Sequence, residues 1–267
     1  MKKFFYIFFL NLIIFIFSKV YAETILVESI NLDNKTPTET NYFKGTQSKV
    51  LLISLPGGDG MSTQTGFGAA GRNHWHNKIF IDLTDANKSM GIFDFVLMSS
   101  PYHLGYGPTS QGSLLRASSD HMQRIENVIL FYKNKTKLPI ILMGHSRGGL
   151  SVMEFVNYVI KNNKNELLQG IIMSGANEGG NMWLKNLNIP TFFLHHKNDT
   201  CNITPFSEAK RAHKKLSKKN ESSTVLMVIE GGQNTGDGCN DNFHMFRGAD
   251  EEVRTKLQLE FNKINFK

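Results

Sequence analysis

The sequence predicts a single α/β domain, in which helices cover both faces of a mostly parallel central sheet. Short apolar runs alternate with helical patterns along the chain after residue 22, as strand–helix–strand units require. Several runs are apolar throughout instead of alternating, which is typical of parallel strands buried on both faces. Because no repeat, low-complexity tract or linker divides the chain, we expect one domain over residues 23–267.

Each expected strand is a short run rich in apolar and β-branched residues. The strands are expected at residues 24–32, 49–55, 93–99, 139–144, 170–175, 191–196 and 223–230. Helical patterns occupy residues 119–133, 147–161, 205–218 and 249–262. In the second of these helices, one face collects apolar residues at helical spacing, namely Val152, Val156, Val159 and Ile160.

The first 22 residues have the pattern of a secretory signal peptide. Lys2 and Lys3 give it a positive start, and Ala22 offers a small residue for cleavage. The apolar stretch at residues 4–17, roughly 14 residues, is shorter than the ~20 that a membrane-spanning helix needs. No cysteine follows it to carry a lipid. We therefore expect cleavage near Ala22, export to the periplasm or beyond, and no stable membrane anchor on the mature chain.

The balance of charge gives little indication of an anionic partner. The chain carries a net charge of +7, and loss of the expected signal peptide removes three lysines and no acid, which leaves +4. The basic run at residues 210–219 has no aromatic residues between its charges, as stacking on nucleic-acid bases would need. We interpret it as a solvated helix face and expect no nucleic-acid partner.

The sequence G-H-S-R-G at residues 144–148 joins an expected strand directly to an expected helix. In one interpretation this is a tight connection with an incidental serine. In the other it is a nucleophile elbow, a turn so sharp that it holds a serine side chain out for reaction. Glycines on both sides of Ser146 tolerate the dihedral angles of such a turn and let strand and helix approach closely. The strand before the turn and the helix after it favour the nucleophile.

On this motif and on the order of its elements, the chain resembles the α/β-hydrolase family of serine hydrolases over roughly residues 24–262. The short stretch HHKNDTC at residues 195–201 also resembles the acid loop of exported bacterial members of the family. The resemblance implies a Ser-His-acid triad, with the three residues in the chain order serine, acid, histidine.

The resemblance places the acid after a late strand and the histidine in a loop after the last strand. Asp199 and His244 meet these two demands. The carboxylate would orient the imidazole, and the imidazole would take the proton of Ser146. Three acids are alternatives to Asp199, namely Glu178, Asp237 and Asp241. The other histidines precede the serine, precede the acid or lie in the basic helix.

Cys201 and Cys239 are the only cysteines in the chain. In an exported protein, a lone pair of this kind is interpreted as a disulfide. Cys201 lies two residues after the expected acid, and Cys239 lies five residues before the expected histidine. A bond between them would therefore join the acid loop to the histidine loop. Two unrelated buried thiols are the alternative.

The negative oxygen of a tetrahedral intermediate needs backbone N–H donors already in place. The resemblance implies one donor at Arg147, directly after the nucleophile, and another in the loop after an early strand. Residues 51–61 fit the second donor, because Gly57 and Gly58 follow an apolar run. Which of the two glycines donates is left open, and an ordinary glycine-rich turn is the alternative.

Sequence patterns for other chemistries do not occur. The glycine-rich loop is not followed by the G-K-[ST] of a phosphate loop, and it lacks the spacing of a dinucleotide-binding fingerprint. The chain has no H-E-x-x-H pair and no cysteine cluster. We therefore expect neither a metal nor an organic cofactor.

Only residues 176–190 separate the acid strand from the strand before it, which leaves no room for a lid domain. The additional length lies earlier, in a glycine-rich region at residues 56–92 that we interpret as a long loop, and at residues 100–118. Loops at strand ends build the site in this kind of fold. Aromatic residues near these ends are candidates for the pocket wall, with ordinary packing as the alternative: Trp75, Tyr102, Tyr106 and Trp183.

Together these residues predict an exported serine hydrolase that cleaves carboxylic esters of small molecules through an acyl-enzyme. The same triad cleaves amides and thioesters, so a peptidase or a thioesterase is the alternative among enzymes. A binding module that keeps the fold without turnover is the alternative from another class. The complete triad favours an enzyme, because a decayed site should lose at least one member.

Overall fold

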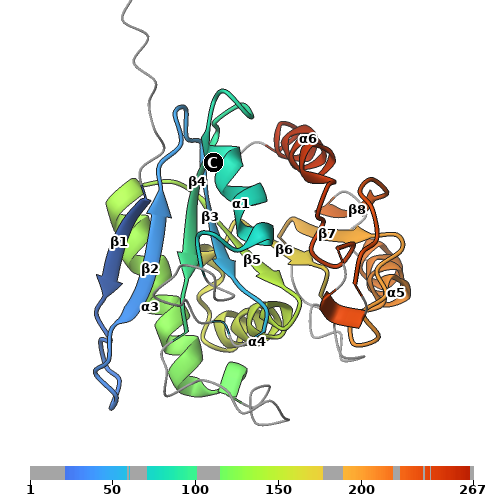
Figure 1. Ribbon diagram of the computed structural model, residues 1–267. Coiled ribbons are helices and arrows are strands. Elements are labelled where there is room, and N and C mark those ends of the chain that lie inside the picture. The colour runs from blue at the N-terminus through green and yellow to red at the C-terminus, as the bar shows by residue number, and fades with distance from the viewer. Residues whose placement is uncertain are drawn as a thin grey trace, which may run out of the picture.

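The computed structural model describes residues 22–58, 60, 71–100, 115–176, 189–218, 223–236, 238–240 and 242–264. Its centre is an eight-stranded sheet in the order β1-β2-β4-β3-β5-β6-β7-β8 (Figure 1). The strands are β1 (Ala22–Val27), β2 (Thr38–Phe43), β3 (Val50–Leu55), β4 (Phe93–Met98), β5 (Ile140–His145), β6 (Gly170–Ser174), β7 (Thr191–His196) and β8 (Thr224–Ile229). Strands β3 to β8 pair in parallel, whereas β2 pairs antiparallel with both β1 and β4. The predicted mostly parallel sheet is confirmed.

Helices cover both faces of the sheet, as predicted (Figure 1). One apolar core joins the first face to α3 (Ser119–Thr136), α4 (Gly148–Lys161) and α5 (Phe206–Ser217). A second core joins the other face to α1 (Trp75–Ile81) and α6 (Asp250–Phe261). Among the helices of the described ranges, none is long and apolar enough to span a bilayer.

Strand β5 explains why the runs in the sequence are continuously apolar. Successive side chains of a strand point to opposite faces of the sheet. Ile140 and Leu142 therefore lie in the first core, and Ile141 and Met143 lie in the second. Both faces are buried, so neither set of positions tolerates polar residues.

Strand β2, with the sequence TETNYF, is an addition that the hydropathy pattern does not predict. Most of its polar side chains are buried, and these find partners inside the protein. The hydroxyl of Thr40 lies 2.7 Å from that of Tyr132, and the Tyr42 hydroxyl donates to Asp94 at 2.5 Å. Because these hydrogen bonds offset the cost of burial, a polar strand can lie between β1 and β4.

The interpretation of residues 56–92 as one long loop is wrong. This region contains α1 and a 3₁₀ helix at Asp82–Thr84. Helix α1 buries Ile79 and Phe80 in the second core. With only seven residues, it is too short to show a helical period in the sequence.

The candidate site residues follow the carboxyl ends of parallel strands. Gly57 follows β3, Ser146 follows β5, Asp199 follows β7, and His244 lies in the chain after β8. In open parallel sheets, ligands bind at this edge. Residues 175–190 alone connect β6 to β7, so no lid domain is inserted there.

Candidate active site

Ser146 lies in a sharp turn between β5 and α4, with the left-handed φ angle of 51° that a nucleophile elbow requires. Its backbone N–H donates to the carbonyl oxygen of Ser174 at 2.9 Å, which ties the turn to the end of β6. The positions of Gly144 and Gly148 leave no space for a side chain. A Cβ atom on Gly148 would lie 1.9 Å from the carbonyl oxygen of Leu55, and one on Gly144 would lie 2.4 Å from that of Gly148. The chain therefore holds Ser146 in a strained conformation at a place where strand and helix nearly touch.

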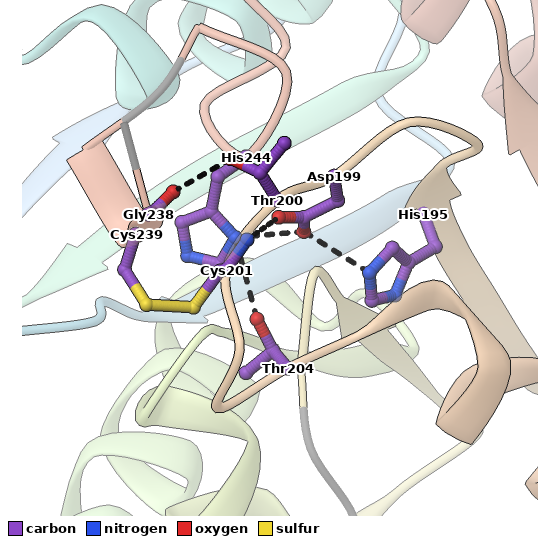
Figure 2. Close-up of a disulfide and its surroundings, with 8 residues drawn as sticks. All are labelled: His195, Asp199, Thr200, Cys201, Thr204, Gly238, Cys239 and His244. Atoms are coloured by element: carbon purple, nitrogen blue, oxygen red, sulfur yellow. Dashed lines mark hydrogen bonds and ion pairs between the residues drawn. A yellow bond between two sulfur atoms is a disulfide. The ribbon is translucent and has the colours of Figure 1, made fainter. Parts of the chain in front are cut away.

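Asp199 and His244 form a buried pair. Asp199 Oδ2 accepts a hydrogen bond from His244 Nδ1 at 2.8 Å, and both side chains are only 1% exposed (Figure 2). The second carboxylate oxygen, Oδ1, accepts from the backbone N–H of Cys201 at 2.8 Å. With the Nδ1 proton of His244 directed at the carboxylate, a neutral imidazole presents Nε2 as its acceptor.

The pKa of Asp199 reflects these partners. Burial by itself would raise the pKa of this carboxyl, but its contacts with His195 and His244 and the Cys201 amide lower the pKa to about 2. Asp199 is therefore ionised throughout the physiological pH range and provides a fixed negative charge next to His244.

A disulfide joins Cys201 to Cys239, as expected, and so links the loop after β7 to the segment before His244 (Figure 2). Its neighbours connect the same two segments, because the Thr200 hydroxyl donates to the Gly238 carbonyl oxygen at 3.4 Å. The bond lies beside the acid–histidine pair, and Cys239 itself lines the adjoining cavity.

One cavity of about 350 Å³ brings the expected residues together. Ser146 and His244 line it, and so do the three candidates for the two expected backbone donors, namely Arg147 and either Gly57 or Gly58. A Cβ atom on Gly57 would lie 2.9 Å from the Cβ of Ser146, so only glycine allows this approach. The cavity therefore holds a candidate nucleophile, a candidate base and candidate oxyanion donors within one space.

Of the four aromatic residues expected in the pocket wall, only Trp75 is among the described residues, and it does not line the cavity. Trp75 is 38% exposed and stacks beneath the guanidinium of Arg247. Its neighbours His74 and His76 line the cavity instead, because consecutive residues at a helix start point in different directions. Several other residues named from the sequence lie outside the described residues, namely Tyr102, Tyr106, Glu178, Trp183, Asp237 and Asp241.

A buried pair of histidines beneath the elbow is a feature that sequence reasoning missed. The rings of His76 and His145 stack with centroids 3.6 Å apart, and each ring has a nitrogen 3.3 Å from the Ser174 hydroxyl. Burial lowers the pKa of both imidazoles well below the usual value, so both are neutral. The His145 ring lies 5.0 Å from that of His244, so these neutral rings form the floor next to the candidate base.

His196, the last residue of β7, connects the end of the sheet to the loop of the candidate base. Its Nε2 donates to the Gly231 carbonyl oxygen at 2.9 Å, and its ring stacks on Phe243 at 4.1 Å. Phe243 immediately precedes His244, so the end of β7 supports the loop that carries the candidate base.

The protein has an α/β-hydrolase fold, with the candidate residues Ser146, Asp199 and His244 after the carboxyl ends of its strands. The sequence matches no protein-family model and no curated protein. Among solved structures, the chain is similar to an α/β serine hydrolase without a lid from Xanthomonas campestris, with TM-score 0.57, 12% identity, and coverage of 92% of this chain and 95% of that one. It is similar to dienelactone hydrolase from Anabaena variabilis, with TM-score 0.56, 11% identity, and coverage of 93% and 99%.

A thermostable esterase is a further similar structure, with TM-score 0.60, 15% identity, and coverage of 91% of this chain and 62% of that one. At these identities the similarities establish the fold. The α/β-hydrolase fold predicted from the sequence is confirmed, and the short stretch of sequence between the end of β6 and the start of β7 leaves no room for a lid domain.

Proposed function

We propose that the protein is a serine hydrolase that cleaves carboxylic esters of small molecules through an acyl-enzyme. Ser146 is the nucleophile, His244 the general base and Asp199 the residue that orients the base. The observation that carries the proposal is the 2.8 Å bond between Asp199 and His244, at a cavity that His244 shares with Ser146. The similarity to hydrolases and an esterase supports the reaction class.

In the first half of the reaction, Ser146 Oγ attacks the ester carbonyl carbon while His244 Nε2 takes its proton. The carbonyl oxygen becomes an anion, and the N–H groups of Arg147 and of Gly57 or Gly58 stabilise it. The intermediate collapses, the alcohol leaves with the proton from His244, and the acyl group stays on Ser146. Asp199 stays ionised and stabilises the imidazolium.

In the second half, a water molecule attacks the acyl-enzyme while His244 takes one of its protons. Collapse of the second tetrahedral intermediate returns that proton to Ser146 Oγ and releases the carboxylic acid. The buried histidines His76 and His145 are neutral, so these two rings add no charge to the floor of the cavity.

Hydrolysis assays on matched esters, thioesters and amides test the proposal. We expect turnover of esters, and a loss of at least ~10⁴-fold in kcat for Ser146→Ala and His244→Ala. Ser217→Ala on the surface of α5 is the matched serine control and should retain activity. Preferred cleavage of amides or thioesters would instead identify a peptidase or a thioesterase. A folded protein without turnover of any of them would favour a binding module.

We also propose that the protein is exported after cleavage near Ala22. The disulfide supports this, because such bonds persist in oxidising compartments. Mass spectrometry of the protein from the producing cell tests the proposal: the mature chain should begin at residue 23 and be found outside the cytoplasm. Retention of residues 1–22 on a cytoplasmic protein would contradict it.

A further inference from the structure

Arg116 is a buried arginine that connects the loop after β3 to the helix after Ser146. It lies just before α3 and is only 3% exposed. Its Nη2 donates to three successive backbone carbonyl oxygens, those of Pro56 at 2.9 Å, Gly57 at 3.2 Å and Gly58 at 3.1 Å. Its Nη1 donates to the hydroxyl of Ser151 on α4 at 3.2 Å.

These bonds determine where the N–H groups of the glycine loop point. The peptide bonds here are trans, so the C=O and the N–H of each peptide unit point in opposite directions. The carbonyl of Pro56 shares its peptide unit with the N–H of Gly57, and the carbonyl of Gly57 shares its unit with the N–H of Gly58. When Arg116 holds both carbonyls, both N–H groups are turned away from the guanidinium.

The loop needs such an anchor because of its composition. Close approach to Ser146 allows no side chain on Gly57, and glycine has the greatest conformational freedom of any residue. Gly58 and Gly60 both have positive φ angles, and the N–H of Gly60 donates to the Gly57 carbonyl oxygen at 2.9 Å. One local bond leaves much of this freedom, whereas the guanidinium fixes three carbonyls at once.

We propose that Arg116 is the positioning residue of the oxyanion hole, which holds the N–H groups of Gly57 and Gly58 toward the cavity. The inference rests on the proposed function and adds to it a residue that does not touch the substrate. Ser151 is the second anchor: it fixes the guanidinium to α4, the helix that begins directly after the nucleophile turn.

His121 on α3 supports this anchor, since its Nε2 lies 3.0 Å from the Ser151 hydroxyl. Burial lowers the pKa of His121 to about 3, so the ring is neutral and its Nε2 can accept a hydrogen bond from the Ser151 hydroxyl. Because the hydrogen of the Ser151 hydroxyl points toward His121, a lone pair of the oxygen faces Arg116 and accepts a hydrogen bond from Nη1. The planar guanidinium of Arg116 has separate donor groups for Ser151 and for the loop carbonyls. The single ammonium group of lysine cannot reach both in this geometry, so lysine should be a poor replacement.

The chain offers a matched control. Arg124 on α3 is fully buried and likewise donates to backbone carbonyl oxygens, those of Asn34 and Thr36 between β1 and β2. Arg116→Lys and Arg124→Lys therefore make the same chemical change in two buried networks. The network of Arg116 contacts the loop next to Ser146, whereas the contacts described for Arg124 lie at the segment between β1 and β2 and within α3.

Kinetics on an ester provide the first readout. Arg116→Lys should lower kcat about 10²-fold, as the loss of an oxyanion donor does, and should leave KM within about threefold. Ser151→Ala, which retains the arginine and keeps a small helix-forming residue, should lower kcat about tenfold. Arg124→Lys should leave kcat unchanged. Equal losses of kcat in Arg116→Lys and Arg124→Lys, or an unchanged kcat in Arg116→Lys, would overturn the inference.

A second readout does not depend on activity. The amide resonances of Gly57 and Gly58 in ¹⁵N NMR spectra should be single in the parent and in Arg124→Lys, and should broaden or split in Arg116→Lys. Unchanged glycine resonances in Arg116→Lys would overturn the inference even if the parent is active. If the parent hydrolyses no substrate, the proposed function fails, whereas the resonances still decide whether Arg116 positions the loop.

Discussion

The imidazole of His195 approaches the carboxylate of Asp199 opposite His244, with Nε2 3.1 Å from Oδ2 (Figure 2). His195 belongs to β7 and is fully buried, so it comes from the rigid sheet and not from a loop. Asp199 thus lies between a strand residue at ion-pair distance and the candidate base. This arrangement limits the directions in which the carboxylate can point.

His195→Phe tests the contribution of this second histidine. The pKa of Asp199 lies below its unfolded value of ~3.9, so its ionisation stabilises the fold above that pH. This stability is lost as the pH falls toward about 2. Without His195, the pKa of Asp199 should rise, and acid unfolding should begin at a higher pH. His195→Gln retains an N–H donor and should behave more like the parent; acid-unfolding curves that coincide for all three proteins would refute the role.

Asp199→Asn removes the charge and leaves the shape. We expect kcat to fall about 10⁴-fold, because the amide no longer holds the productive tautomer of His244. Stability of the variant should also depend less steeply on pH between about 4 and 2, since the titrating group is gone. Kinetics and urea unfolding at several pH values measure both effects. If the variant kept the kcat of the parent, a residue other than Asp199 would have to orient His244.

Reduction of the Cys201–Cys239 bond should lower activity before it unfolds the domain. The bond closes a loop of 38 residues, for which chain entropy predicts a stabilisation of about 4 kcal/mol. It also lies next to Asp199, whose Oδ1 accepts from the Cys201 amide. Activity and circular dichroism are followed as the reductant concentration rises. The double variant Cys201→Ser and Cys239→Ser controls for other effects of the reductant, and unchanged turnover in it would refute the prediction.

Gly148→Ala should destabilise the fold by about 3 kcal/mol, because its new Cβ would meet the carbonyl oxygen of Leu55 at 1.9 Å. Gly238→Ala is the matched control. Its φ angle is positive, at 54°, unlike that of Gly148, and a Cβ atom there would have nothing within 4 Å. It should cost about 1 kcal/mol from backbone strain alone. Equal free energies of unfolding for the two variants would argue against the close packing of the elbow.

Much of the fold is predictable from the sequence because β3 to β8 and their helices are specified by local patterns. Ile140 to Met143 are buried on both faces, and their hydrophobicity alone marks β5 as a central strand. Strand β2 escapes prediction because its stability comes from hydrogen bonds to distant residues such as Tyr132 and Asp94. Helix α1 escapes because it is short.

The candidate triad could be named from the sequence because each member follows a strand in a fixed order. The supporting residues are harder to find from the sequence. Arg116 and His196 bind backbone atoms that are distant along the chain, and such contacts leave no spacing pattern. His195 lies only four residues before Asp199, but it precedes the acid, outside the chain order that marks the triad. The wall of the cavity is similarly unpredictable, because the direction of Trp75 depends on where α1 begins.

Labelling by a fluorophosphonate probe tests the central claim, an activated serine at position 146, most directly. The probe reacts with a serine only when a base and oxyanion donors activate it. We expect strong labelling of purified residues 23–267, and loss of labelling in Ser146→Ala and in His244→Ala while both variants remain folded. A folded parent protein that does not label, or labelling that survives in Ser146→Ala, would contradict the account.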